Sequence, residues 1–294
     1  MIRLGTRASA LALAQARSVA ERLPGEVELV TITTSGDRSS REDKSRFVKE
    51  IEEALLAGDV DLAVHSAKDV PGELPDGLSI VGVPPRAEAL DALCGAESLA
   101  SLDDGAAIGT SSIRRRAQLL ALRADLEVRE LRGNVDTRLR RLAEGGFDAI
   151  VLARAGLVRL GRGDEGKALP ELVPAPGQGC LVLEARSGDQ AAREAAATLT
   201  DGDSLTALTA ERALVAALEA TCNTPIGAHA RGEGAQLRLA AFVGLPDGSH
   251  WIRDELDGAA ADPAALGREV ARRLEAAGAR ELLAEAERSA GTRT

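Results

Sequence analysis

Aromatic residues, cysteines and histidines are scarce in this chain of 294 residues. One tryptophan, three phenylalanines and no tyrosine leave few side chains on which single-stranded bases could stack, so we expect no nucleic-acid partner. Cys94, Cys180 and Cys222 lie far apart without a CxxC pair, and the three histidines have no metal-ligand spacing. The sequence therefore predicts neither a disulfide framework nor a metal site, and its free thiols suit a reducing cytoplasm.

Long hydrophobic runs are also missing. No stretch approaches the ~20 apolar residues that a membrane-spanning helix needs. The apolar run that begins near Ser9 is short and is interrupted by Gln15 and Arg17, which argues against a signal peptide. We expect a cytoplasmic protein that acts as a monomer and has no membrane partner.

Arginine is concentrated in one segment of an otherwise acidic chain. The net charge is −10, yet residues 107–162 hold twelve arginines, no lysine and only six acidic residues. This local excess of positive charge indicates an anion site. A solvated basic helix face is the open alternative for any single arginine.

The order of apolar and helical patterns indicates the fold class. Up to residue 200, short apolar runs alternate with helical patterns, which predicts two α/β domains with largely parallel sheets. The expected strands are 2–4, 27–32, 61–66, 78–83, 106–109, 128–131 and 149–153, and the expected helices are 9–23, 46–57 and two that begin after Ser111 and Gly133.

From residue 203 the pattern changes. A helix over 204–219 precedes antiparallel strands over 236–244 and 250–256, which predict a smaller α+β domain. The strand-like run 180–185 can return to the first domain. The predicted domains are therefore 1–84 together with about 177–200, then 85–176, and finally 201–294.

Lys68 and Asp69 directly follow the expected strand 61–66, and Pro71 fixes the backbone just beyond them. In open α/β sheets ligands bind beyond the carboxyl ends of the strands, so this is a suitable place for a catalytic pair. A Lys-Asp pair on an exposed turn is the alternative, and the dipeptide alone favours it.

Three expected corners from strand to helix carry arginine. They are Gly5-Thr6-Arg7-Ala8-Ser9, Gly109-Thr110-Ser111-Ser112-Ile113-Arg114-Arg115 and Arg132-Gly133-Asn134-Val135-Asp136-Thr137-Arg138. Hydroxyl and amide side chains there can cap the helices, while arginines near a helix start oppose the helix dipole unless an anion compensates them. Because arginine binds carboxylates with two hydrogen bonds, the corners indicate an acidic ligand in a cleft between two domains. Phosphate remains an alternative, although a P-loop is missing.

Cys222 lies in a polar stretch that we expect to be a helix end followed by a Pro-Ile-Gly loop. Such a position is compatible with a reactive thiol, whereas Cys94 and Cys180 fit small buried hydrophobic residues. The residues alone leave the role of Cys222 open.

Together these motifs resemble porphobilinogen deaminase, also called hydroxymethylbilane synthase. The resemblance runs nearly from end to end and rests on the motifs GTRxSxLAxxQ (5–15), HSxKDVP (65–71), GTSSxRR (109–115), LRGNVxTRL (131–139), DAIVLAxAGLxRLG (148–161), PxPGQG (174–179), TAER (209–212) and CxxPIG (222–227). It implies three domains, of which the first two are similar to periplasmic binding proteins and the third carries a cofactor cysteine. The implied activity is a transferase reaction of haem and tetrapyrrole biosynthesis, in which four porphobilinogen molecules are condensed head to tail with loss of ammonia and the product is hydrolysed to hydroxymethylbilane.

The resemblance also implies roles for single residues. Asp69 would stabilise the cation that forms when ammonia leaves, and Cys222 would carry a dipyrromethane cofactor through a thioether. Further cofactor contacts would come from Lys68, Thr110, Ser112, Arg114 and Arg115. The substrate would be bound by Arg7, Ser9, Lys44, Phe47, Arg132, Arg138, Arg159 and Gln178, with Lys44 and Phe47 in a lid segment.

Two segments depart from the family pattern. The lid reads Lys44-Ser45-Arg46-Phe47 where the family usually has Lys-Gly-Leu-Phe, and Ala220-Thr221 replace the glycines that commonly precede the cofactor cysteine. A carboxylate-binding protein without catalysis is the alternative function, but a binder would need neither Cys222 nor Asp69.

Overall fold

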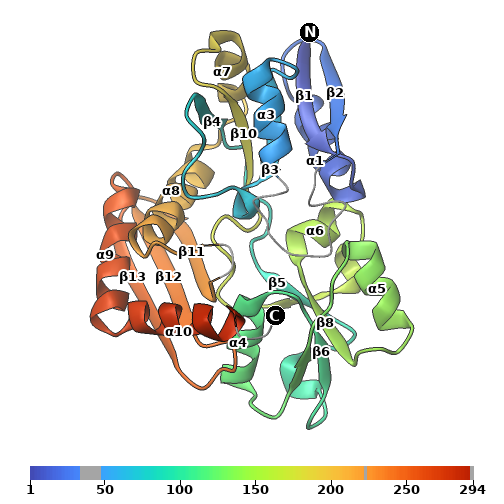
Figure 1. The fold of residues 1–294 in the computed structure, drawn as a ribbon, viewed down its shortest axis with the longest axis vertical. Coiled ribbons are helices and arrows are strands. Elements are labelled where there is room, and N and C mark those ends of the chain that lie inside the picture. The colour runs from blue at the N-terminus through green and yellow to red at the C-terminus, as the bar shows by residue number, and fades with distance from the viewer. Residues whose placement is uncertain (34–47, 222–223, 292–294) are drawn as a thin grey trace. The chain divides into compact units, whose positions relative to one another are not determined.

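A computed structural model describes residues 1–33, 48–221 and 224–291. The chain forms two compact units, which comprise residues 1–87 with 179–205 and residues 88–178 with 206–294. The described residues form three sheets. Each unit contains one five-stranded sheet with its helices, whose elements are labelled in Figure 1.

The first unit is built on a five-stranded sheet with the order β2-β1-β3-β10-β4. Only β10 runs against the other strands, because it pairs antiparallel with both β3 and β4. The elements are β1 (Ile2–Arg7), α1 (Ala10–Ala20), β2 (Val27–Ile32), α3 (Lys49–Ala57), β3 (Leu62–Ser66), β4 (Leu78–Gly82), β10 (Leu181–Arg186) and α7 (Gln190–Ala197). The run 180–185, which was predicted to return to the first domain, overlaps β10, and β10 lies between β3 and β4 in this sheet.

Helices cover both faces of this first sheet. Leu4, Leu62 and Leu183 on one face pack with α1 and α7. Ala63 on the other face packs against Ile51 of α3. All five residues are fully buried. Because helices cover both faces of the sheet, its strands are apolar on both sides.

The second unit contains another five-stranded sheet, of order β7-β6-β8-β5-β9, in which only β5 is reversed. Its elements are β5 (Asp91–Cys94), β6 (Ala107–Gly109), α4 (Ile113–Leu122), β7 (Glu127–Arg129), α5 (Val135–Ala143), β8 (Ala149–Ala153), α6 (Arg154–Arg159) and β9 (Lys167–Leu169). In each sheet four strands run in one direction and one strand is reversed. When these four strands are numbered in chain order, both sheets have the order second, first, third, reversed strand, fourth. The two α/β sheets with mostly parallel strands are therefore confirmed.

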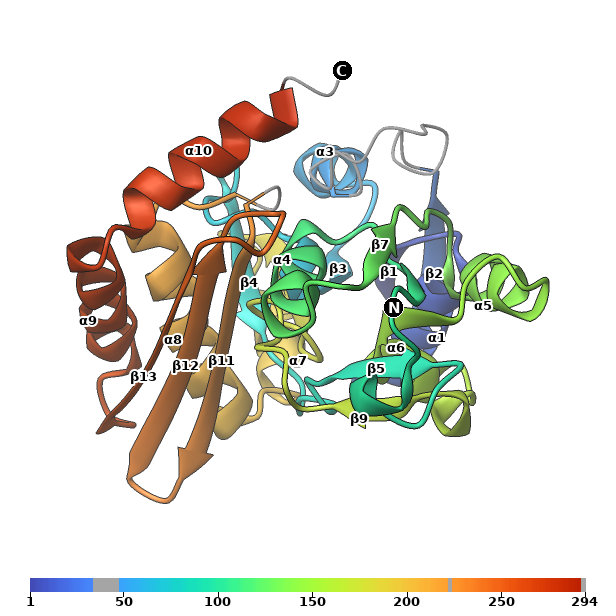
Figure 2. The same ribbon diagram turned by 90° about the horizontal axis from the view of Figure 1, so that it is seen from below.

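The C-terminal part of the chain forms a three-stranded antiparallel sheet, β11-β12-β13. Helices α8, α9 and α10 pack on one face of this sheet (Figure 2). The elements are α8 (Gly202–Ala217), β11 (Ile226–Glu233), β12 (Gln236–Gly244), β13 (Trp251–Ala259), α9 (Pro263–Ala276) and α10 (Ala279–Gly291). The small α+β part is confirmed, but the expected Pro-Ile-Gly loop is wrong from Ile226 onward, where β11 begins.

The opposite face of β12 packs against α4. Phe242 of β12 forms a small core with Ala117 of α4 and with Val173. Next to it, Gly248 has a φ of 74°, and a Cβ there would lie 2.5 Å from the backbone nitrogen of Ala121. Only glycine fits this turn, because both its backbone conformation and the close approach of α4 exclude a side chain.

Candidate functional site

Asp69 ends a short 3-10 helix, Ala67–Asp69, that directly continues β3. We call this segment the Asp69 turn. The Ala67 backbone N–H donates to the carbonyl of Cys180 at 3.1 Å, which ties the turn to the start of β10. Just before it, the Gln15 side-chain amide donates to Ser66 Oγ at 3.0 Å. The position of Asp69 is thus fixed from two neighbouring elements.

The carboxylate of Asp69 is partly buried, and within the described residues it makes no hydrogen bond or ion pair. Lys68 beside it is also partly buried. Carboxylates that are withdrawn from water normally have a partner. The Asp69 oxygens are therefore available to donors or to a positive charge on a ligand, as a catalytic role requires.

The corner between β1 and α1 is closed by its own side chains. Ser9 caps α1 by accepting a hydrogen bond from the Ala12 backbone N–H at 3.3 Å. Thr6 Oγ1 donates to the Ala12 carbonyl at 3.2 Å. Arg7, the last residue of β1, is partly buried at the carboxyl end of the sheet, as the predicted substrate contact requires.

The corner between β6 and α4 places two predicted residues at a helix start. Ser112 caps α4 by accepting from the Arg115 backbone N–H at 3.4 Å. The Ser112 backbone N–H in turn donates to Thr110 Oγ1 at 3.2 Å. The local order Thr-x-Ser therefore shapes the corner, and the positive end of the helix dipole favours an anion there.

Arg114 and Arg115 point into the unit, where both meet Asp91. Arg114 Nη1 lies 2.8 Å from Asp91 Oδ2, and Arg115 Nη2 lies 2.8 Å from Asp91 Oδ1. The backbone carbonyls of Val173 and Val151 accept from Arg114 and Arg115 respectively. Asp91 is 0% exposed, Arg114 3% and Arg115 5%. Their role in cofactor binding stays a prediction, but their immediate task is internal.

Gln178 joins the same cluster. Its Nε2 donates to Asp91 Oδ1 at 2.9 Å and to the Ala89 carbonyl at 2.7 Å, and the side chain is 1% exposed. The adjacent Gly177 backbone N–H donates to the buried carboxylate of Glu211 at 2.6 Å. The predicted substrate contact of Gln178 remains untested, while its side chain holds Asp91.

Asp91 was missed by sequence reasoning, although three predicted site residues converge on it. Burial alone would raise the pKa of its carboxyl, but Arg114, Arg115 and Gln178 hold this pKa well below the usual range. The feature of the sequence that could have revealed Asp91 is an acidic residue directly before the apolar run Ala92-Leu93-Cys94. One carboxylate faces two guanidinium groups, so the cluster carries an uncompensated positive charge.

The corner before α5 depends on glycine. Gly133 has a φ of 113°, and Asn134 caps the helix by accepting from the Thr137 backbone N–H at 2.9 Å. Arg138 Nε donates to the Gly133 carbonyl at 2.7 Å, and its Nη2 donates to Ser111 Oγ at 3.1 Å. Arg138 therefore links this corner to the α4 corner.

The remaining predicted residues are dispersed. Arg132 is exposed and its Nη2 lies 2.6 Å from Glu130 Oε1, whereas Arg159 ends α6 and is partly buried. Lys44, Phe47 and Cys222 lie outside the described residues.

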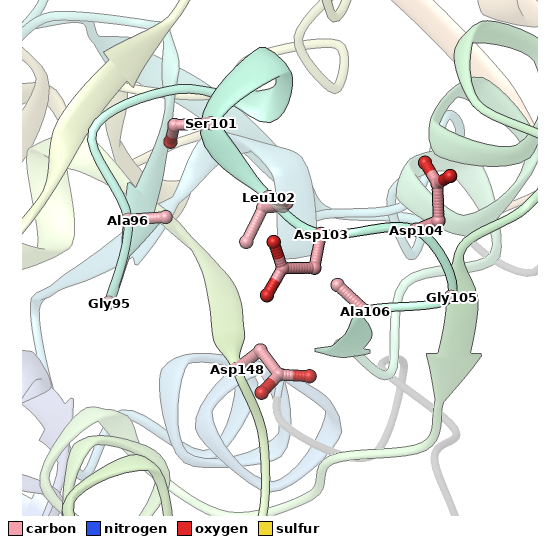
Figure 3. A pocket seen from close by; sticks show the side chains of 9 residues that line it. All are labelled: Gly95, Ala96, Ser101, Leu102, Asp103, Asp104, Gly105, Ala106 and Asp148. Carbon is pink, nitrogen blue, oxygen red and sulfur yellow. The ribbon is translucent and has the colours of Figure 1, made fainter.

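A hollow elsewhere in the second unit has a different character. It measures about 330 Å³ and is lined by Asp103, Asp104 and Asp148, with no predicted site residue (Figure 3). Acidic lining residues would repel a carboxylate-rich ligand. Within the described residues no group of His, Cys, Asp and Glu is placed to hold a metal ion. None of the helices described here is both long and apolar enough to cross a membrane.

Comparison with known proteins decides the family. Residues 2–194 match the model of the porphobilinogen deaminase dipyromethane cofactor binding domain, and residues 205–276 match that of the porphobilinogen deaminase C-terminal domain. The chain belongs to the porphobilinogen deaminase family. The porphobilinogen deaminase of Thermus thermophilus is 48% identical over 96% of this chain and 98% of its own length. That of Roseiflexus castenholzii is 48% identical with the same coverage.

These matches confirm the predicted resemblance to porphobilinogen deaminase and the predicted dipyrromethane cofactor. Among solved structures, a periplasmic substrate-binding protein of an ABC transporter from Coxiella burnetii matches with a TM-score of 0.43. Its sequence is 18% identical, and the match covers 70% of this chain and 94% of that one.

The residues around α4 fit a dipyrromethane group, whose acetate and propionate side chains are anionic. Arg114 and Arg115 supply two positive charges against the one negative charge of Asp91, and Arg114 Nε is a buried donor without a hydrogen-bond partner in the described chain. Thr110 and Ser112 add hydroxyl groups at the start of the helix. An anionic group bound at this corner would neutralise the excess charge.

Proposed function

We propose that this protein is a transferase, a hydroxymethylbilane synthase. It condenses four porphobilinogen molecules head to tail, releases ammonia from each, and hydrolyses the product to hydroxymethylbilane. The observation that carries the proposal is the partly buried Asp69 carboxylate, which has no hydrogen bond or ion pair within the described residues, in a member of this family. The alternative of a carboxylate-binding protein without catalysis is not favoured, since it leaves this carboxylate without a task.

Asp69 meets the positive charge of the reaction. Loss of ammonia from porphobilinogen leaves a cation that is delocalised over the pyrrole ring. A carboxylate that accepts from the pyrrole N–H stabilises this charge as it develops, and its fixed position avoids reorganisation during the reaction. The same oxygens can take and return the protons that the ring carbon and the leaving amine exchange. The anchoring of the Asp69 turn by Cys180 and Gln15 supports this role.

Arginines hold the negative side chains of the substrate. In this proposal Arg7, Arg132, Arg138 and Arg159 bind acetate and propionate groups with paired hydrogen bonds. Ser9, Lys44, Phe47 and Gln178 complete the substrate contacts. Arg114, Arg115, Thr110, Ser112 and Lys68 hold the dipyrromethane, which supplies the pyrrole position to which the first substrate is joined. Cys222 binds it through a thioether.

Domain boundaries, location and assembly belong to the same proposal. Residues 1–84 with about 177–200 would form the domain of Asp69, residues 85–176 the arginine-rich domain, and residues 201–294 the domain of the cofactor cysteine. The protein would work in the cytoplasm as a monomer.

Intact mass of the purified protein tests the proposal. The wild type should be heavier than its sequence by two linked pyrrole units, and the Cys222→Ser variant should have the unmodified mass. Cys94→Ser is the matched control and should keep the excess, because Cys94 is buried in β5. A wild-type chain that stays unmodified after incubation with porphobilinogen and releases no ammonia would overturn the assignment.

A further inference from the structure

A second group of buried titratable side chains lies in the first unit, and the proposed mechanism does not use it. His65 Nε2 of β3 lies 3.0 Å from Glu184 Oε2 of β10, and the two side chains are 4% and 1% exposed. Glu52 of α3 is 8% exposed. We call these three residues the His65 cluster.

The register of the sheet explains why they meet. On antiparallel strands, directly paired residues face the same side, and β3 and β10 pair Ala63 with Glu184 and His65 with Val182. Because Ala63 packs in the core under α3, His65 and Glu184 also face α3. Glu52 approaches them from that helix, and its pKa responds to the charges of both.

The cluster has too few positive charges. Apart from the ion pair, neither oxygen of Glu184 nor His65 Nε2 has a hydrogen-bond partner in the described chain, and Glu52 Oε1 is likewise buried without one. Even when it is protonated, the single imidazole can neutralise only one of two carboxylates. Isolated buried charges are costly, so burial favours a proton on the second carboxylate.

The other charged groups on the packed elements do not supply the missing charge to Glu52. Lys49 pairs with Glu53, Arg3 with Asp61, and Arg186 with Asp189. The remaining charged residues of α3 and β1 are Glu50 and Arg7, whereas the pKa of Glu52 responds to the charges of Glu184, His65 and Glu53. Burial first, and then the negative charge of Glu184, raise the pKa of the Glu52 carboxyl, and the smaller effect of His65 opposes this.

We propose that the His65 cluster is a proton-dependent positioning device for the Asp69 turn. A proton retained on Glu52 lets α3 pack against β3 and β10, and the contact between His65 and Glu184 holds the end of β3. His65 is separated from the Asp69 turn only by Ser66. Loss of the proton places two like charges under α3 and shifts the end of β3, and with it Asp69. The coupling to turnover rests on the proposed function, whereas the retention of the proton on Glu52 does not.

The sign of the pH effect follows from the raised pKa. Folded protein keeps a proton on Glu52 that the unfolded chain releases, so the stabilisation is present below the ordinary pKa of 4.5 and is lost as pH rises through the folded pKa. Glu52→Gln imitates the protonated acid at every pH. The stability advantage of Glu52→Gln over the wild type should therefore grow as pH rises above 4.5, the ordinary pKa of a glutamate.

The test compares Glu52→Gln, Glu184→Gln and the control Glu53→Gln in the holoenzyme, by melting temperature and kcat from pH 5 to pH 9. Glu53 is the matched control, because it lies next to Glu52 on α3 but is exposed and pairs with Lys49. We expect Glu52→Gln to melt increasingly above the wild type as pH rises and to keep kcat at alkaline pH. Glu184→Gln should lower kcat by about tenfold or more with little change in KM, since a displaced catalytic group costs turnover. Glu53→Gln should stay much closer to the wild type, because the charge of Glu53 has the smallest of the three effects on Glu52.

Each deviation has a distinct meaning. A melting difference between Glu52→Gln and wild type that does not depend on pH would overturn the proton retained on Glu52. A melting difference that depends on pH while both proteins have the same alkaline profile of kcat would overturn the coupling to Asp69. A wild type without hydroxymethylbilane synthesis would refute the proposed function, while the melting temperatures would still decide whether Glu52 retains its proton.

Discussion

The two five-stranded sheets share one strand order but carry buried clusters of opposite charge balance. In the second unit, Arg114 and Arg115 share the single carboxylate of Asp91. In the first, the single imidazole of His65 pairs with Glu184, and the buried carboxylate of Glu52 adds a second acidic group. An excess of positive charge is neutralised by an anionic ligand, whereas an excess of negative charge is neutralised by a proton. The same fold can thus prepare one region for a ligand and another for a pH response.

The aspartates of the two units differ in the same way. Asp91 is fully buried and has three partners, whereas Asp69 is partly buried and has none within the described residues. A carboxylate that is paired with buried guanidinium groups contributes to stability, and one whose acceptors are unused is available for chemistry. Substitution of each aspartate should separate the two uses.

Asp69→Asn should have the largest effect on activity. The amide keeps the shape of the side chain but lacks the charge that stabilises the cation, so we expect kcat to fall by about 10³-fold or more. The melting temperature should stay within error of the wild type, because no described partner is lost. Consumption of porphobilinogen and thermal unfolding measure the two quantities. Substantial remaining turnover would show that another group stabilises the cation.

Asp91→Asn should have the largest effect on stability. It leaves two buried guanidinium groups without their counter-charge, which costs about 3–5 kcal/mol in unfolding free energy when one partner of a buried ion pair is removed. Urea unfolding measures the loss, and Asp125→Asn is the control because its ion pair with Arg123 is exposed. Equal losses in the two variants would contradict the buried charge balance.

The Asp91 cluster also sets the acid limit of stability. Because its folded pKa is lowered, the stabilisation is present above the ordinary value of 3.8 and is lost as pH falls through the folded pKa. Unfolding free energy measured at falling pH should therefore decline more steeply below that value in the wild type than in Asp91→Asn. Parallel curves would show that Asp91 titrates alike in folded and unfolded chains.

Ser111→Ala should have the smallest effect. It removes the hydroxyl that accepts from Arg138 and links the two corners, a contribution of about 0.5–1.5 kcal/mol. If Arg138 binds substrate, KM should rise severalfold while kcat is nearly unchanged. Ser98→Ala should leave KM unaltered, because the Ser98 hydroxyl caps the 3-10 helix Leu99–Ser101 and accepts from the Ser101 backbone N–H rather than from a predicted site residue. A change in kcat alone would contradict the role of this contact in binding.

Much of the fold could be predicted because local patterns agree with it. The bounds predicted for β2, β8 and β12 match the structure. The helix caps at Ser9, Ser112 and Asn134 were visible as small polar residues between an apolar run and a helical pattern. The strand predicted at 128–131 differs from β7, because parallel pairing with the three residues of β6 sets the length of β7.

Elements defined by distant partners were missed. β5 has only four residues and begins with Asp91, and β9 has three residues of which two are exposed. Neither segment has a periodic pattern of its own. They are strands only because β5 pairs with both β8 and β9. For the same reason the sequence did not reveal that Asp91 and Glu184 face charged side chains far away in the chain.

The reversed strands also determine when each sheet can be completed during synthesis. Among the described strands β4 pairs only with β10, so residues 78–82 have no strand partner until residues 181–186 have been made. The last described strand of the second sheet is β9, which ends at Leu169. The second five-stranded sheet can thus be completed before the first, and a nascent chain that stalls between these points exposes an open apolar strand edge to chaperones and to aggregation.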